Sequence, residues 1–145
     1  MKAKQLIPQV SGNEIISTLF YLYLSLYLIG RSIFFITVRK EVVFSSEWYT
    51  SLATVFDIRF WSVITIVAGL LIFISIFAIN EHGLVVLISG NLLAFMVYTV
   101  FSLTGANVGM SWFTMYMHAI NATFHLILLV WGVLSLSKMI KMRNT

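Results

Sequence analysis

The amino-acid sequence predicts an all-α membrane protein: a bundle of four transmembrane helices, with a short amphipathic helix between the first and second spans. Hydrophobic residues make up 60% of the chain and charged residues 10%, whereas a soluble domain has about 45–50% and about 25%. Four apolar stretches are close to the roughly 20 residues that a spanning helix needs. Since the remaining segments are too short to bury a core, we expect one integral membrane domain over residues 1–145.

The first span is predicted over about residues 15–38. Ser11 and Glu14 precede its apolar run at the spacing of a capping box. In that motif the serine hydroxyl and the acidic side chain each bond the backbone N–H of the other residue, which satisfies donors at the start of a helix.

The connection after the first span is polar but carries aromatic residues at helical spacing. Trp48, Leu52 and Phe56 recur every four residues, which places them on one face of a helix. We therefore predict a helix from Ser46 to Phe56 that lies in the membrane interface on the outer side, with Ser45 or Ser46 as its cap. The alternative is an ordinary loop with scattered aromatic residues.

Three further spans are predicted over about residues 60–79, 84–104 and 112–137. The second and third spans are separated by a tight hairpin, in which Gly83 is expected to take the left-handed conformation. A glycine-containing segment, residues 105–109, separates the third span from the fourth.

The distribution of basic residues predicts the orientation. An even number of spans places both termini on one side, and short cytoplasmic segments are enriched in Lys and Arg. The terminal side carries five such residues and the other side three, which favours cytoplasmic termini and a multi-pass protein of the cell membrane. The five are Lys2, Lys4, Lys138, Lys141 and Arg143, and the three are Arg39, Lys40 and Arg59.

Polar side chains interrupt the fourth apolar stretch. His118, Asn121 and His125 stand at positions i, i+3 and i+7, and therefore on one helix face, and Thr114 falls on the same stripe. The third span has a comparable stripe that includes an asparagine and a tyrosine. We predict an intramembrane polar seam turned toward the bundle interior. Its members are Arg31, Asn91, Tyr98, Thr114, His118, Asn121 and His125.

We interpret this seam as structural, because interhelical hydrogen bonds help to select which helix faces meet where lipid provides little hydrophobic drive. Two histidines could also be haem or metal ligands. His118 and His125 are, however, about 10 Å apart along a helix that rises about 1.5 Å per residue, so one helix cannot clamp a haem between them. We expect no metal site and no cofactor, and no catalytic residues.

Arg31 is the costliest residue within the spans, because a central arginine costs about 2.5–3.5 kcal/mol on insertion scales. It is near the end of its span, so its side chain could extend toward the outer surface or pair with Glu41, Glu47 or Asp57. In the predicted orientation its depth is close to that of His118.

The segments YLYLSLYLIGRSIFFI (21–36), FSSEWY (44–49) and RFWSVITIVAGLL (59–71) together resemble small four-helix bacterial membrane proteins. These include DoxX-like proteins and uncharacterised membrane proteins of phages and mobile elements in Gram-positive bacteria. The resemblance lies in layout over about the first half of the chain, and the acidic residue that DoxX-like proteins carry in the second span is absent. It implies a bacterial or phage origin and no particular chemistry.

Three functional classes follow. The first, which we favour, is a non-enzymatic helix bundle that interacts with other membrane components, with the lipid bilayer and with either further copies of itself or another membrane protein. The second is a holin-like or channel-forming oligomer, and the third is a redox or transport component that uses the histidine face. Nucleic acid is not an expected partner, because the basic residues stand at the ends of apolar runs.

Overall fold

The computed structural model describes residues 12–37, 45–78 and 81–143. These residues form five helices, and no strand occurs among them. Four of the helices are long and apolar enough to cross a membrane. The predicted all-helical class, with four long apolar helices, is therefore confirmed.

Helices α1 (Gly12–Thr37) and α4 (Ile58–Ser75) correspond to the first two predicted spans. The predicted cap Ser11 lies outside the described residues. Helix α4 begins earlier than predicted because Asp57 is its N-cap, and its carboxylate accepts a hydrogen bond of 2.7 Å from the backbone N–H of Arg59. It also ends earlier, because the backbone tightens there into bonds between residues three apart.

Helix α3 (Glu47–Val55) confirms the helix expected between the first two spans; Ser46 occupies its N-cap position, but its side chain makes no capping hydrogen bond. Trp48 and Leu52 are buried, as their spacing predicts. Phe56 departs from the prediction, because it stands after the last turn in extended conformation and is exposed. The apolar stripe of α3 packs against the other helices, so contact with protein accounts for it without contact with lipid.

Helix α5 (Glu81–Asn107) starts three residues before the predicted third span. The left-handed conformation expected of Gly83 is therefore wrong, because this residue lies in the first turn of the helix and has no positive φ. Position 83 has no room for a side chain, since a Cβ there would collide with the backbone carbonyl of Ala78, and this accounts for the glycine.

Helix α6 (Trp112–Arg143) extends past the predicted end of the fourth span. Its last turns contain good helix formers, and Arg143 makes an ion pair of 3.0 Å with Glu81 at the start of α5. The turn before α6 centres on Gly109, which has φ of 63°, whereas Gly105 is still within α5. The break between the last two spans is thus shorter than predicted.

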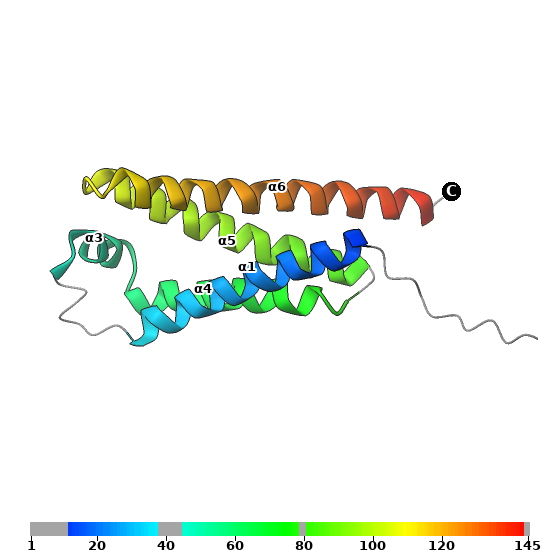
Figure 1. Ribbon diagram of the computed structural model, residues 1–145, viewed down its shortest axis with the longest axis horizontal. Coiled ribbons are helices and arrows are strands. Elements are labelled where there is room, and N and C mark those ends of the chain that lie inside the picture. The colour runs from blue at the N-terminus through cyan, green and yellow to red at the C-terminus, as the bar shows by residue number, and fades with distance from the viewer. Residues whose placement is uncertain (1–11, 38–44, 79–80, 144–145) are drawn as a thin grey trace, which may run out of the picture.

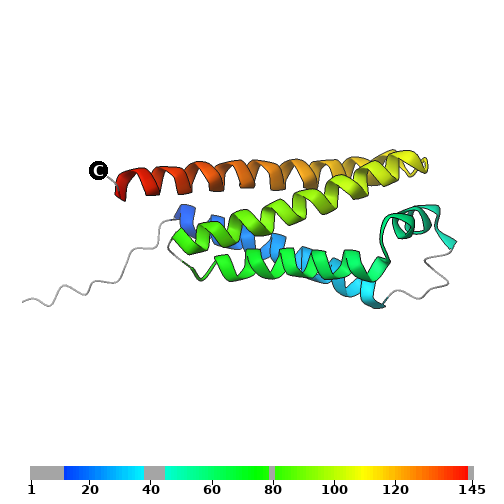
Figure 2. The same ribbon diagram turned by 180° about the vertical axis from the view of Figure 1, so that it is seen from behind.

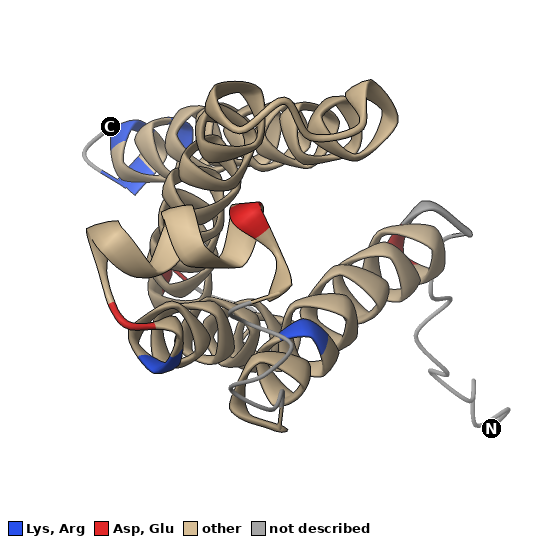
Figure 3. Ribbon diagram, turned by 90° about the vertical axis from the view of Figure 1, so that its left-hand side faces the viewer, with Lys and Arg blue, Asp and Glu red and all other residues tan. Residues whose placement is uncertain are grey.

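The four long helices run nearly along one axis, with α3 at one end (Figures 1 and 2). The start of α1 and the end of α6 lie at the opposite end from α3 (Figure 1). Extensive backbone contacts join α1 to α4, α4 to α5 and α5 to α6. Seen from the α3 end, α1 and α6 diverge, and the ribbon carries few charged residues (Figure 3). Helices α1 and α6 therefore meet through side chains and not along close backbones, as in the hydrogen bond between Arg31 and His118 and the ring contact between Phe20 and Phe124.

Glycines permit the close approach of successive helices. A Cβ on Gly69 of α4 would lie 3.0 Å from the carbonyl oxygen of Ser25 in α1, and one on Gly90 of α5 would lie 3.1 Å from that of Ala68 in α4. Small residues at such contacts let helix backbones approach and increase the packing attraction between them.

A reciprocal serine pair also joins α1 to α4. The Ser32 hydroxyl donates to the backbone carbonyl of Ser62 at 2.7 Å, and the Ser62 hydroxyl donates to that of Ser32 at 3.0 Å. Both side chains are fully buried. Each hydroxyl is satisfied across the interface, which selects the register of these two helices.

Candidate functional site

The Arg31 guanidinium lies among aromatic rings at the α3 end of the bundle. Its Cζ atom is 5.0 Å from the ring centroid of Phe101, 5.5 Å from that of Phe35 and 5.7 Å from that of Tyr98. Each such contact is worth about 0.5–2 kcal/mol, depending on how far the cation is removed from water. Three electron-rich ring faces thus offset part of the cost of placing this cation inside the fold.

The carboxylates expected to pair with Arg31 do not do so in the part of the chain that the structure describes. Neither Glu47 nor Asp57 is within ion-pair distance of the guanidinium, and the Asp57 carboxylate caps α4. Glu41 lies outside the described residues.

His118 is the hydrogen-bond partner of Arg31. Its Nε2 atom is 3.3 Å from Nη2 of Arg31. A guanidinium can only donate hydrogen bonds, so Nε2 accepts, and the proton of a neutral imidazole is then on Nδ1. The ring is buried and stacks on Trp48 of α3, with ring centroids 5.8 Å apart and planes 16° apart.

Tyr98 lies between the two histidines of α6. Its ring stacks on His125 at 5.6 Å with an interplanar angle of 9°, and its centroid is 6.0 Å from that of His118. The side chain is fully buried, and its hydroxyl has Tyr27 of α1 as a hydrogen-bonding neighbour, although the two do not meet ordinary hydrogen-bond geometry. We define Arg31, Tyr98 and His118 as the Arg31 cluster.

Asn91 and His125 form a second polar contact between α5 and α6. Nδ1 of His125 is 2.8 Å from Oδ1 of Asn91, while Nδ2 of Asn91 donates to the carbonyl of Leu87 at 2.9 Å. The second bond identifies the amide oxygen, so His125 donates through Nδ1. Both side chains are buried, and this pair is the kind of interhelical bond for which the seam was predicted.

The structure does not bring the remaining two predicted seam residues into these contacts. The Asn121 amide donates to the carbonyl of Met117 in its own helix at 2.9 Å. Thr114 is partly exposed near the start of α6. Helical phase placed both on the histidine stripe, but α5 covers only part of that stripe.

Sequence reasoning missed the aromatic surroundings of Arg31. Phe35 and Phe101 look like ordinary residues of an apolar span, and Trp48 was noted for its helical spacing alone.

The indole N–H of Trp48 donates to the carbonyl of Phe101 at 3.3 Å, and the indole N–H of Trp61 donates to the carbonyl of Leu52 in α3 at 3.3 Å. Two indoles thus attach α3 to the bundle.

Tyr49, on the same short helix, packs edge-on against Phe35 with ring centroids 6.2 Å apart. Burial raises the pKa of the Tyr49 hydroxyl above its ordinary value, and the positive charge of Arg31 opposes part of that rise. Tyr49 is therefore a neutral neighbour of the Arg31 cluster at physiological pH.

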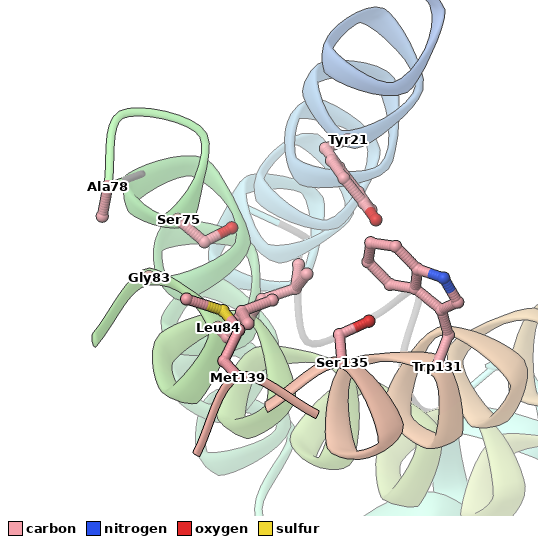
Figure 4. A pocket seen from close by; sticks show the side chains of 9 residues that line it. Tyr21, Ser75, Ala78, Gly83, Leu84, Trp131, Ser135 and Met139 are labelled. Atoms are coloured by element: carbon pink, nitrogen blue, oxygen red, sulfur yellow. The ribbon is translucent and has the colours of Figure 1, made fainter. Parts of the chain in front are cut away.

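A groove opens between α1 and α6 at the opposite end of the bundle. It consists of two adjoining cavities of about 350 Å³ each that share Tyr21, Ser75 and Trp131. The Tyr21 side chain from α1 and the Trp131 indole from α6 point toward each other across it (Figure 4). The other lining residues are Glu14, Ser17, Thr18, Ile76, Ala78, Gly83, Leu84, Leu87, Ser135 and Met139. We call this feature the α1–α6 groove.

Among the described residues, no group of three or more histidine or acidic side chains is arranged to hold a metal ion. The groups that the fold brings together are hydrogen-bond donors around one cation at the α3 end, and small polar and aromatic side chains at the other end. Both sets of side chains can form hydrogen bonds and ring contacts with a bound group.

Comparison with known proteins finds no matching family model, no matching curated protein and no matching solved structure. The layout resemblance to DoxX-like and mobile-element membrane proteins therefore remains a prediction.

Proposed function

We propose that this chain is a non-enzymatic, multi-pass protein of the cell membrane, of bacterial or phage origin, that acts by binding another membrane-spanning helix in the α1–α6 groove. The observation that carries the proposal is the hollowed α1–α6 side of the bundle. These two helices make no extensive backbone contact where they face each other, although side chains such as Phe20 and Phe124 meet, and that side is hollowed and partly polar.

The lining of the groove favours a protein helix over lipid chains. Ser17, Thr18 and Ser135 offer hydroxyls to the groove, for which a hydrocarbon chain provides no hydrogen-bond partner, whereas the Ser75 hydroxyl donates to the carbonyl of Ile72. Small and hydroxyl-bearing residues are the ones through which membrane helices associate. The occupant is either a second copy of this chain or a different membrane protein.

Reporter fusions test the proposed topology. A fusion after Thr145 should report the cytoplasmic side and one within residues 41–57 the outer side, because five basic residues against three favour this orientation. The common end of α1 and α6 supports the same-side placement of both ends (Figure 1). A C-terminal reporter active only outside the cytoplasm would contradict the topology.

Site-directed photo-crosslinking tests the binding surface. The chain has no cysteine, so a single Ser135→Cys substitution can carry a benzophenone probe in the groove without a competing thiol. We expect a covalent adduct with a second polypeptide in native membranes. The matched control is Leu134→Cys, whose side chain is adjacent but 64% exposed; it should give several-fold less protein adduct. Equal yields from the two positions would refute the groove as a helix-binding site.

A further inference from the structure

The second half of α6 carries an exposed stripe of side chains that ends in two lysines. Its members follow one another at alternating steps of four and three residues, which places them on one face of the helix. They are Ile127, Trp131, Leu134, Lys138 and Lys141, and we call them the α6 stripe. Ile127 is 57% exposed and Leu134 64%, and both lysines are exposed. The stripe therefore changes from apolar to cationic within about one helical turn.

The apolar part of the α6 stripe has the length of one membrane leaflet. Ile127 and Lys138 are separated by about 16 Å along the axis, since an α-helix rises about 1.5 Å per residue. Half of a hydrocarbon core about 30 Å thick is about 15 Å. When the lysines are at the level of the lipid headgroups, Leu134 and Ile127 consequently lie alongside the acyl chains of the same leaflet.

The positive charge of α6 is concentrated at its C-terminal end (Figure 3). Arg143 makes an ion pair with Glu81, so its charge is already compensated. Lys138 and Lys141 stand three residues apart, where like charges on a helix repel each other. An anion close to both ammonium groups would relieve that repulsion, which favours a negatively charged partner at this point of the surface.

We propose that the α6 stripe binds an anionic phospholipid, with the headgroup phosphate at Lys138 and Lys141 and an acyl chain along Leu134 and Ile127. A phospholipid matches both parts of the stripe, because its charge and its hydrocarbon belong to one molecule. A net negative headgroup is attracted more strongly by basic residues near the membrane surface than a zwitterionic one. The inference rests on the proposed membrane location, but it does not depend on what occupies the α1–α6 groove.

A second copy of α6 fits the same stripe less well. Steps of four and three residues are also the spacing through which two helices pair. In a parallel two-fold pair, however, Lys138 and Lys141 of one copy would face the same lysines of the other. Four ammonium groups in one place repel one another, whereas a phospholipid supplies the opposite charge.

Quenching of tryptophan fluorescence by brominated lipid tests the proposal, with Trp131 as the reporter. Its indole is 51% exposed and lies about 10 Å from Lys138 along the axis, at the depth of the acyl chains. The substitution Trp112→Phe removes the other strongly exposed indole, while Trp48 and Trp61 are buried.

This variant of the full chain is reconstituted into vesicles of equal parts phosphatidylglycerol and phosphatidylcholine, with bromine on the acyl chains of one lipid or of the other. We expect Trp131 to be quenched more by brominated phosphatidylglycerol. The expected preference is roughly fivefold or more in the association constant, the effect of about one lysine near an anionic surface.

Substitutions of the lysines decide whether the preference arises at the α6 stripe. Lys138→Gln should lower the preference several-fold, and Lys138→Gln combined with Lys141→Gln should bring it close to one. Both side chains are exposed, so the fold should not change. The matched control is Arg59→Gln, which removes the same charge from an exposed residue of α4 at the α3 end and should leave the preference intact.

Two results would overturn the lipid site while leaving the proposed membrane location unaffected. One is equal quenching of Trp131 by the two brominated lipids. The other is a phosphatidylglycerol preference that persists when both lysines are replaced. Absence of quenching of Trp131 by either lipid would instead contradict the membrane location, and with it both the proposed function and this inference.

Discussion

Replacing Trp48 with alanine is expected to detach α3 from the bundle and to cost about 3–5 kcal/mol, the usual range for removal of a buried tryptophan. Trp48 is 5% exposed and contacts Phe35, Phe101 and His118 through its ring. Its indole N–H also donates to the Phe101 carbonyl, so the substitution leaves a cavity and removes an interhelical hydrogen bond.

Hydrogen exchange measures this effect locally. Amides of residues 47–55 should exchange faster in Trp48→Ala, while those of the four long helices should keep their protection, because α3 makes few other buried contacts. Trp131→Ala is the matched control, since that indole is 51% exposed and belongs to α6. Unchanged protection of α3 in Trp48→Ala would show that Leu52 and Trp61 suffice to hold it.

Replacing Gly90 with leucine is expected to disrupt the α4–α5 interface. The first added carbon alone would lie 2.9 Å from Cγ1 of Ile72 and 3.1 Å from the backbone oxygen of Ala68. A side chain can change rotamer, but the Ala68 backbone can give way only if α4 moves. We therefore expect a cost at or above the roughly 1–3 kcal/mol typical of overpacked cores.

Gly30→Leu is the control for this substitution, because nothing lies within 4 Å of a Cβ at Gly30. Both variants should insert and keep their helices, since helix formation in a bilayer does not require the interface. Denaturation by an ionic detergent, followed by tryptophan fluorescence, should occur earlier for Gly90→Leu only. Coincident transitions of the two variants would contradict the close contact.

Part of the candidate site could be predicted from the sequence. Helical phase placed His118 and His125 on one face, and depth placed Arg31 at the level of His118; the structure joins Arg31 to His118 and His125 to Asn91. Phase alone could not show that Asn121 would bond within its own helix. That outcome depends on how α6 is rotated against α5, which no property of α6 in isolation determines.

The sequence by itself determined the four long apolar helices and the short helix between the first two, because hydropathy and helical spacing are local properties. The turn at Gly109 is local in the same way. The Asp57 cap is local too, but it was not predicted, and the helix that it begins was expected to start at residue 60. Only the tertiary structure decided that α1 and α6 meet through side chains and not along close backbones, that aromatic rings surround Arg31, and that Gly83 serves close packing rather than a left-handed turn. The physical reason is that membrane helices associate through surface shape and a few hydrogen bonds, each averaging about 0.6 kcal/mol. Because each of these contributions to the free energy of helix association is small and depends on geometry, the pairing of helices can be worked out only when the surfaces of both helices are known.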